Sequence, residues 1–448
     1  MMTAPVAVSF NEALRFWLKM GFISFGGPAG QIAIMHRELV EQKRWISEKR
    51  FLHALNYCMV LPGPEAQQLA TYIGWLMHGT RGGIVAGSLF VLPSLAILIA
   101  LSWIYIAFGT VPLIAGIFYG IKPAVTAIVL AAAWRIGGKA LKNMWLWAIA
   151  AAAFVAIFAG GVPFPAVVLC AAVIGAIGGR IAPEKFVPGG GHGGADDGAG
   201  TALIDDDGPA PPHAIFRLPR ILLYLAVGLG LWFAAMGLLV AHSGIQGTLT
   251  QMGWFFTKAA LLTFGGAYAV LPYVYQGAVE NFQWLNAHQM IDGLALGETT
   301  PGPLIMVVAF VGFIGGWTKA VLGPEALFLG AALAACVVTF FTFLPSFLFI
   351  LVGGPLVEAT HGQQKFTAPL TAITAAVVGV IVNLSLFFAW KIWWPLATSD
   401  APFSGKFEWF AMVVTLAAAV ALTRYKANVI AVIGVCGALG VAKTLWGG

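Results

Sequence analysis

"LTFGGAYAV" (Leu262–Val270) places two adjacent glycines inside an apolar stretch where a membrane helix would otherwise run on. A second copy, "ISFGGPAGQ" (Ile23–Gln31), carries the same Phe-Gly-Gly 239 residues earlier. At the same offset, the tripeptide Pro-Gly-Pro occurs at residues 62–64 and again at 301–303. A repeat of this kind predicts two homologous halves that contain the same two interruptions.

The composition places the chain in a membrane. Of its 448 residues, 60% are hydrophobic and 9% are charged, whereas soluble proteins are about half apolar and a quarter charged. Several apolar runs approach the roughly 20 residues that a spanning helix needs, and they do not alternate as the strands of a barrel would. We therefore expect an all-α polytopic membrane protein with two homologous halves and broken or re-entrant helices.

Residues 180–220 separate the two halves. This segment combines Gly, Pro and five aspartates and offers little to bury, which is typical of a flexible linker. The sequence thus predicts a repeat at 1–179, a cytoplasmic linker at 180–220, and a second repeat at 221–448. The second repeat begins with an extra apolar segment, Ile221–Ala241, that the first repeat lacks.

Charge predicts that the second half is inverted. The loop His36–Arg50 holds five Lys or Arg, while its counterpart Tyr275–Gln289 holds none. Basic loops stay on the cytoplasmic side, so equivalent loops would face opposite sides of the membrane, as in an inverted repeat. The net charge of +6 is therefore interpreted as topology, with no nucleic acid as a partner.

The interruptions are the expected substrate site. A broken helix exposes backbone N–H groups, which cost several kcal/mol each in hydrocarbon unless a cavity, water or an anion satisfies them. Helix starts carry partial positive charge, and glycine lets an oxyanion approach the backbone. The candidate substrate-binding residues are Ser24, Gly26, Gly27, Gln31, Pro62, Gly63, Pro64, Gln67, Gln68, Thr263, Gly265, Gly266, Tyr268, Thr299, Thr300 and Gly302.

Four charged residues accompany these breaks. Glu65 follows the first Pro-Gly-Pro and Glu298 precedes the second, so each is a candidate for proton coupling or gating, with helix capping as the alternative for Glu65. Lys19 and Lys258, which match at the offset of 239, are candidates for attracting an anion. Snorkelling to the membrane surface is the alternative role of the two lysines.

An enzyme is not expected. A membrane enzyme would need a metal or nucleophile constellation such as His-Glu-x-x-His, which the sequence lacks. No catalytic residue, metal or cofactor is therefore expected. The expected partners are a tetrahedral oxyanion and the lipid bilayer, and a homodimer stays open.

The chain resembles the chromate ion transporter family of bacteria and archaea, in its long-chain form with two homologous halves. The resemblance rests on "FGGPAGQIAIMHRELVEQKRWISEKRF" (Phe25–Phe51), "LPGPEAQQLATYIGW" (Leu61–Trp75) and "GGIVAGSLFVLPS" (Gly82–Ser94), with "FGGAYAVLPY" and "TTPGPL" in the second half. It implies a multi-pass protein of the bacterial inner membrane that exports chromate, a divalent analogue of sulfate, and confers chromate resistance.

The resemblance also implies a signature. Its members here are Gly26, Gly27, Pro28, Gln31, Pro62, Gly63, Pro64, Glu65 and Gln67. The second half has Ala267 and Val270 in place of Pro28 and Gln31, so the two half-sites are expected to be unequal. A transporter of sulfate or another oxyanion and a passive anion channel remain the alternatives.

Overall fold

The computed structural model describes residues 8–25, 27–186, 203–204, 211, 213–264, 266–359, 367–398 and 401–446. Within these ranges the protein is helical, and its only β pairing is an isolated parallel bridge between Ile46 and Ile204. The helices of the first half are α1 Phe10–Ile23, α2 Gly27–His36, α3 Glu48–Val60, α4 Glu65–Phe108, α5 Pro112–Ala140, α6 Met144–Phe158 and α7 Phe164–Ile181. The remaining α-helices are α8 Leu218–Ser243, α9 Thr248–Leu262, α10 Ala267–Tyr275, α11 Ala287–Thr299, α12 Val307–Thr318, α13 Leu327–Ala359, α14 Thr367–Trp393, α15 Trp409–Thr423 and α16 Val429–Trp446.

Five short helical turns join these elements. Two are π-helical, η1 Arg37–Gln42 and η3 Gln276–Asn281, and they directly follow α2 and α10. Three are 3₁₀ turns: η2 Pro183–Lys185, η4 Leu304–Met306 and η5 Pro324–Ala326.

Helices α1–α7 correspond in order to α9–α16, with the single long helix α4 matched by the pair α12 and α13. Helix α8 is the extra element of the second half. Helix α11 lies 239 residues after α3 at both ends, and so does η3 after η1. Local sequence sets the shared starts: the Ser47 side chain caps α3, and Asn286 and Gln289 cap α11 reciprocally. The prediction of an all-helical membrane protein with two homologous halves is confirmed. The inverted arrangement stays a prediction.

Helix α4 is a hairpin of two arms. The backbone turns at His78 and Gly79, where φ is −135° and +62°, and the chain then returns along itself. Small residues let the arms approach closely: a Cβ added to Gly74 would lie 2.5 Å from the Cβ of Ala86. Helices α12 and α13 pack on each other in the corresponding way, and a Cβ on Gly316 would lie 2.6 Å from that of Ala334.

Lengths divide the helices into two groups. Seven are long and apolar enough to cross a membrane among the described residues: the helices at 65–108, 112–140, 164–181, 218–243, 324–355, 368–393 and 429–446. In contrast, α1, α3, α9 and α11 have 13 to 15 residues and reach only about 20 Å at 1.5 Å per residue. Each of these four short helices ends just before a glycine or proline break.

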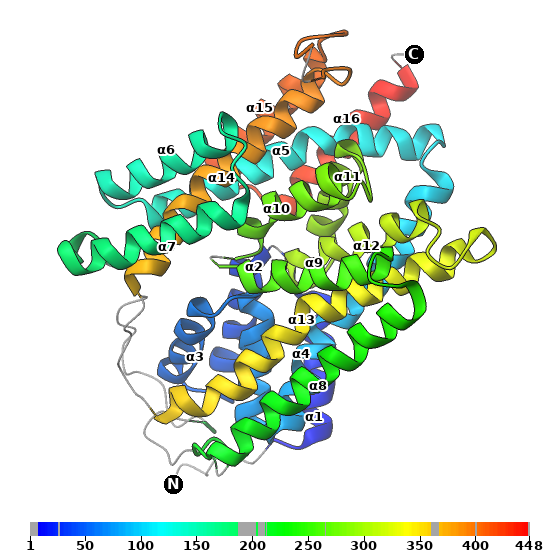
Figure 1. Ribbon diagram of the computed structural model, residues 1–448. Coiled ribbons are helices and arrows are strands. Elements are labelled where there is room, and N and C mark those ends of the chain that lie inside the picture. Colours follow the sequence, from blue (N-terminus) through cyan, green and yellow to red (C-terminus); the bar gives the residue numbers. More distant parts are fainter. Residues whose placement is uncertain are drawn as a thin grey trace.

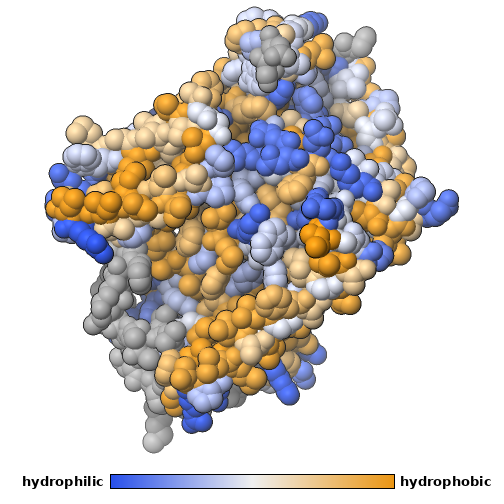
Figure 2. Space-filling view, in the orientation of Figure 1, coloured by the Kyte–Doolittle hydropathy of each residue, from blue (hydrophilic) through white to orange (hydrophobic). Residues whose placement is uncertain are grey.

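Figure 1 shows α1, α3, α4, α8 and α13 in the lower part of the molecule, and α5–α7 with α14–α16 in the upper part. The short helices α2 and α10 lie between these groups. Hydrophobic residues cover the lower surface of this face, over α8 and α13 (Figure 2). Leu222, Phe233 and Leu238 of α8 are exposed there, as expected for a helix that contacts lipid.

Candidate functional site

Two reciprocal hydrogen bonds bring the interruptions of the two halves together. The amide of Gly63 donates to the carbonyl of Thr263 at 2.7 Å, and the amide of Gly302 donates to the carbonyl of Ser24 at 2.8 Å. Ser24 and Thr263 each stand two residues before a Gly-Gly pair. Each Pro-Gly-Pro thus contacts the Gly-Gly segment of the opposite half.

The tripeptide Pro-Gly-Pro is suited to this contact. Proline has no amide hydrogen, so the central glycine carries the only backbone donor of the three residues. Gly63 and Gly302 have φ values of +128° and +104°, which residues other than glycine rarely adopt. Because both amides are engaged between the halves, the free backbone donors of the site are those in the first turns of α2, α4 and α10.

The two contacts differ in their polar surroundings. The side-chain amide of Gln31 in α2 donates to the carbonyl of Gly302, and its nitrogen lies 3.5 Å from the carbonyl of Ser24. Gln31 therefore contacts both residues of the hydrogen-bonded pair Gly302 and Ser24. Val270, its counterpart, cannot do this. The first contact instead has Glu65, whose Oε1 would lie 3.9 Å from a Cβ on Gly266.

Both candidate acids approach the start of α10. Glu65 does so through Gly266, and Glu298 accepts a 2.6 Å hydrogen bond from the hydroxyl of Tyr268. Partial positive charge at a helix start favours carboxylates in this position. Both acids therefore lie beside the first residues of α10.

The positive charges of Lys139 and Arg135 in α5 act over a distance on Glu65 and Glu298, respectively, and both basic side chains are exposed. The sequence analysis missed both residues. The sequence shows them as "WRIGGK" (Trp134–Lys139), two basic residues four apart at the end of a largely apolar helix.

Buried polar atoms without a protein partner gather at the breaks. They include the Ser24 hydroxyl and the Oε1 atoms of Gln31, Gln67 and Gln68, all in side chains that are at most 1% exposed. Buried polar groups are normally hydrogen-bonded to protein or to ordered water. The region is therefore prepared for water or a polar ligand.

Other predicted residues have partners within the protein. The hydroxyls of Thr263, Thr299 and Thr300 donate to carbonyls one turn back on their own helices. The Gln67 amide donates to Thr71 at 3.0 Å, and that of Gln68 donates to the carbonyl of Pro62 at 2.8 Å. Pro64 precedes the first residue of α4, and Gly27, with φ +69°, opens α2. Gly26 and Gly265 lie outside the described residues.

The two candidate lysines lie elsewhere. Lys19 forms an ion pair with Glu38 at 3.2 Å, and 55% of its side chain is exposed. The Lys258 ammonium lies over the ring of Trp254, 5.8 Å from its centroid, on the exposed side of α9. Both arrangements match snorkelling side chains, and none of these contacts involves a break residue.

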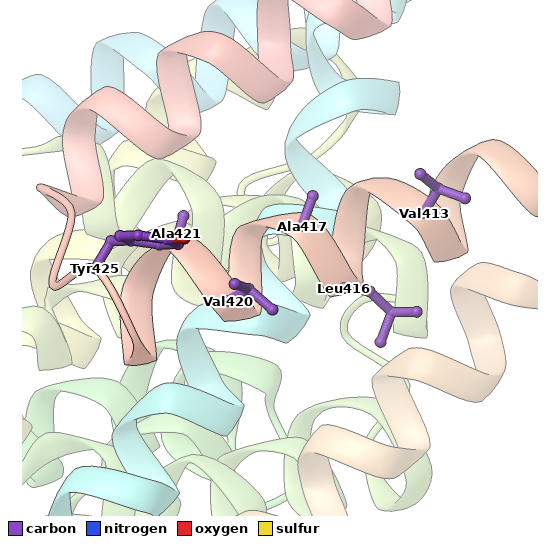
Figure 3. Close-up of a pocket in the computed structure, with 6 residues that line it drawn as sticks. All are labelled: Val413, Leu416, Ala417, Val420, Ala421 and Tyr425. Atoms are coloured by element: carbon purple, nitrogen blue, oxygen red, sulfur yellow. The ribbon is translucent and has the colours of Figure 1, made fainter.

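A hollow on the protein surface is unrelated to this site. Figure 3 shows it along α15, lined by Val413, Leu416, Ala417, Val420, Ala421 and Tyr425. Its lining is almost wholly apolar, and several of these residues are exposed. The hollow contains none of the residues at the breaks.

The paired broken helices and the apolar spans define a multi-pass membrane protein of the transporter class. The family model "Chromate transporter" matches residues 11–176 and 250–441, and the chain belongs to this family. The two matched regions correspond to the two halves.

Three relatives resemble the chain over most of its length. A chromate transport protein of Pseudomonas aeruginosa is 34% identical over 84% of this chain and 80% of its own length. A probable chromate transport protein of Synechococcus elongatus is 30% identical, with 84% of each chain covered. A chromate transport protein of Cupriavidus metallidurans is 29% identical over 86% of this chain and 84% of its own. No solved structure matches.

Proposed function

We propose that this protein exports chromate across a bacterial inner membrane and binds it where the four interruptions meet. The observation that carries the proposal is the pair of reciprocal hydrogen bonds, Gly63 to Thr263 and Gly302 to Ser24. They hold the starts of α2, α4 and α10 together at membrane depth. Two relatives that match most of the chain are named chromate transport proteins, and chromate is therefore the substrate that we propose.

The proposed site binds a dianion mainly through dipoles. The first turn of a helix offers unpaired amides and about half a positive charge. Several starts converge here, and buried polar side chains border them. Arg135 and Lys139 of α5, whose side chains are exposed, add positive charge that acts at longer range on Glu298 and Glu65. Together these groups replace part of the hydration that chromate loses.

Membrane potential is sufficient to drive export. Moving a dianion out of a cell that is negative inside yields about 4.6 kcal/mol per 100 mV, twice the value for one charge. At about 1.36 kcal/mol per tenfold ratio, this supports roughly three decades of concentration. Protons are not needed as the energy source, so we assign Glu65 and Glu298 to gating or to proton antiport.

The proposed topology is an inverted repeat, with units at 1–179 and 221–448 joined by a cytoplasmic linker. Two contacts support the placement of the linker beside the basic loop His36–Arg50. The amide of Ser47 donates to Ile204 at 3.0 Å, and that of Ile204 donates to Trp45 at 3.1 Å. A basic loop faces the cytoplasm, so the linker that pairs with it faces the same side.

Transport in proteoliposomes tests the proposal. Purified protein, reconstituted with labelled chromate inside, is expected to release it faster when the potential drives anions outward, and the rate is expected to saturate. Excess sulfate in the same compartment shows whether a second tetrahedral dianion competes. Failure to move chromate would refute the proposal, and release that never saturates would indicate a channel. Empty liposomes are the control.

A further inference from the structure

Two buried serines occupy equivalent places in the long helices of the two halves. Ser94 follows Leu92-Pro93 in α4, and Ser346 follows Leu344-Pro345 in α13, 252 residues later. Their exposed fractions are 0% and 1%. Each hydroxyl lacks a hydrogen-bond partner in the protein.

Several other buried hydroxyls of these helices bond to their own backbone. Thr339 and Thr342, in α13 itself, and Ser385, in α14, are buried and donate to carbonyls four residues back at 2.7 to 2.8 Å. A helical serine ordinarily makes this bond at once, because the acceptor is always nearby. Ser94 and Ser346 keep their donors free in an environment that penalises free donors.

Both serines lie against the breaks of the opposite half. A Cβ added to Gly63 would stand 2.5 Å from the Ser346 Oγ, and one added to Gly302 would stand 2.7 Å from the Ser94 Cβ and 3.2 Å from its Oγ. Only glycine leaves room for these approaches. Each Pro-Gly-Pro therefore contacts two elements of the other half: the Gly-Gly segment and the serine of the long helix.

The free groups at the breaks differ in kind. The side-chain amide nitrogens of Gln31, Gln67 and Gln68 each donate a hydrogen bond within the protein, whereas their side-chain oxygens, which are acceptors, have no partner. Among the side-chain atoms at the breaks, the hydroxyls of Ser24, Ser94 and Ser346 are donors without a hydrogen-bond partner. Chromate and sulfate present only acceptor oxygens, so these hydroxyls can add to the backbone amides in recognising them.

We propose that Ser94 and Ser346 donate hydrogen bonds to the transported oxyanion, one from each half. This inference rests on the proposed function and adds its side-chain ligands. The two long helices then contribute to the site from opposite sides, and the pseudosymmetric placement lets either serine stay bound while the protein opens to one side of the membrane.

Single and double variants, Ser94→Ala and Ser346→Ala, test the inference. Ser102→Ala is the matched control, because Ser102 is also buried in α4 without a partner but lies eight residues further along the helix. The measurements are the chromate concentration that gives half-maximal efflux and the chromate concentration that gives half-maximal thermal stabilisation of the purified protein. The second readout needs no turnover.

Each single variant is expected to raise both concentrations about tenfold, and the double variant about a hundredfold, with sulfate competition weakened in parallel. Ser102→Ala is expected to match the wild type, and the melting temperature without chromate is expected to stay the same or rise in all four variants. Folded serine variants with wild-type half-maximal concentrations would overturn the inference and leave the proposed function intact. A wild type that neither moves nor binds chromate would overturn both.

Discussion

Glu65 and Glu298 each flank a Pro-Gly-Pro in the sequence, and in the structure both lie beside the first residues of α10. Glu65 approaches Gly266, and Glu298 accepts a hydrogen bond from Tyr268. Of the two, Glu65 has no hydrogen bond described to another side chain, and its strongest electrostatic partner is Lys139. An ionised Glu65 would repel a dianion at the same helix start, so its proton and the substrate should be coupled.

Replacing Glu65 by Gln tests this coupling. Wild-type efflux at subsaturating chromate is expected to fall as pH rises, because ionisation adds a negative charge beside the anion. A repulsion of about 1.4 kcal/mol would weaken binding tenfold. Glu65→Gln is expected to keep the faster rate over the whole pH range. Efflux rates from pH 6 to 8 check this, with Glu325→Gln at an exposed turn as the control. An unchanged pH profile would leave Glu65 as a helix-start charge only.

At the scale of single residues, the sequence identifies the Gly-Gly and Pro-Gly-Pro breaks but not the residues that pack against them. Matching at one offset finds Gly63 and Gly302, because repetition is visible in one dimension. It does not find Ser94 or Ser346, because the offset changes to 252 and a lone serine in an apolar helix usually bonds to its own backbone. Only the packing of one half on the other shows that these hydroxyls stand free at the breaks.

Among the elements, α4 has the shape that is hardest to predict from its sequence. The run from Glu65 to Phe108 contains no proline before Pro93, so no proline marks the turn at His78 and Gly79. Its signal is the polar, glycine-containing "HGTRGG" (His78–Gly83). The second half has its extra residues at the corresponding turn, between α12 and α13. An insertion is tolerated there because a hairpin turn packs against little.

The breaks themselves demand glycine to different degrees, and a pair of variants measures this. Gly27 has φ +69° and nothing within 4 Å of an added Cβ, so Gly27→Ala adds only backbone strain of about 1–2 kcal/mol. At Gly302, where φ is +104°, an added Cβ would also lie only 2.7 Å from the Cβ of Ser94, and overpacking of this kind typically costs about 1–3 kcal/mol more. Thermal unfolding of the purified protein is expected to show a larger loss for Gly302→Ala. Equal losses would mean that the contact between Gly302 and Ser94 is not tight.

On the scale of the whole molecule, the halves interlock. Glu358, near the end of α13, binds Arg50 of α3 and Tyr72 of α4 in a buried cluster. Asp292 of α11 accepts a 2.9 Å hydrogen bond from Tyr105, near the end of α4, and lies 3.4 Å from Lys122 of α5. Since α3 corresponds to α11 and α13 to the second arm of α4, each cluster joins the same pair of elements across the halves. Repetition predicts the equivalence of these elements, but it carries no information on which of them meet.

The inverted topology is the last prediction, and matched positions on the two π-helical turns decide it. Gln42 and Asn281 are both exposed, end η1 and η3, and lie 239 residues apart. Gln42→Cys and Asn281→Cys, each in a background without Cys58, Cys170, Cys336 and Cys436, would be labelled with a membrane-impermeant thiol reagent. In inside-out vesicles, residue 42 is expected to react and residue 281 to be protected, with the reverse in right-side-out vesicles. The basic loop His36–Arg50 has five Lys or Arg and its counterpart none, so charge favours opposite sides. Labelling of both from one side would mean that the repeats are parallel, and the pseudosymmetric approach of Ser94 and Ser346 would then need another explanation.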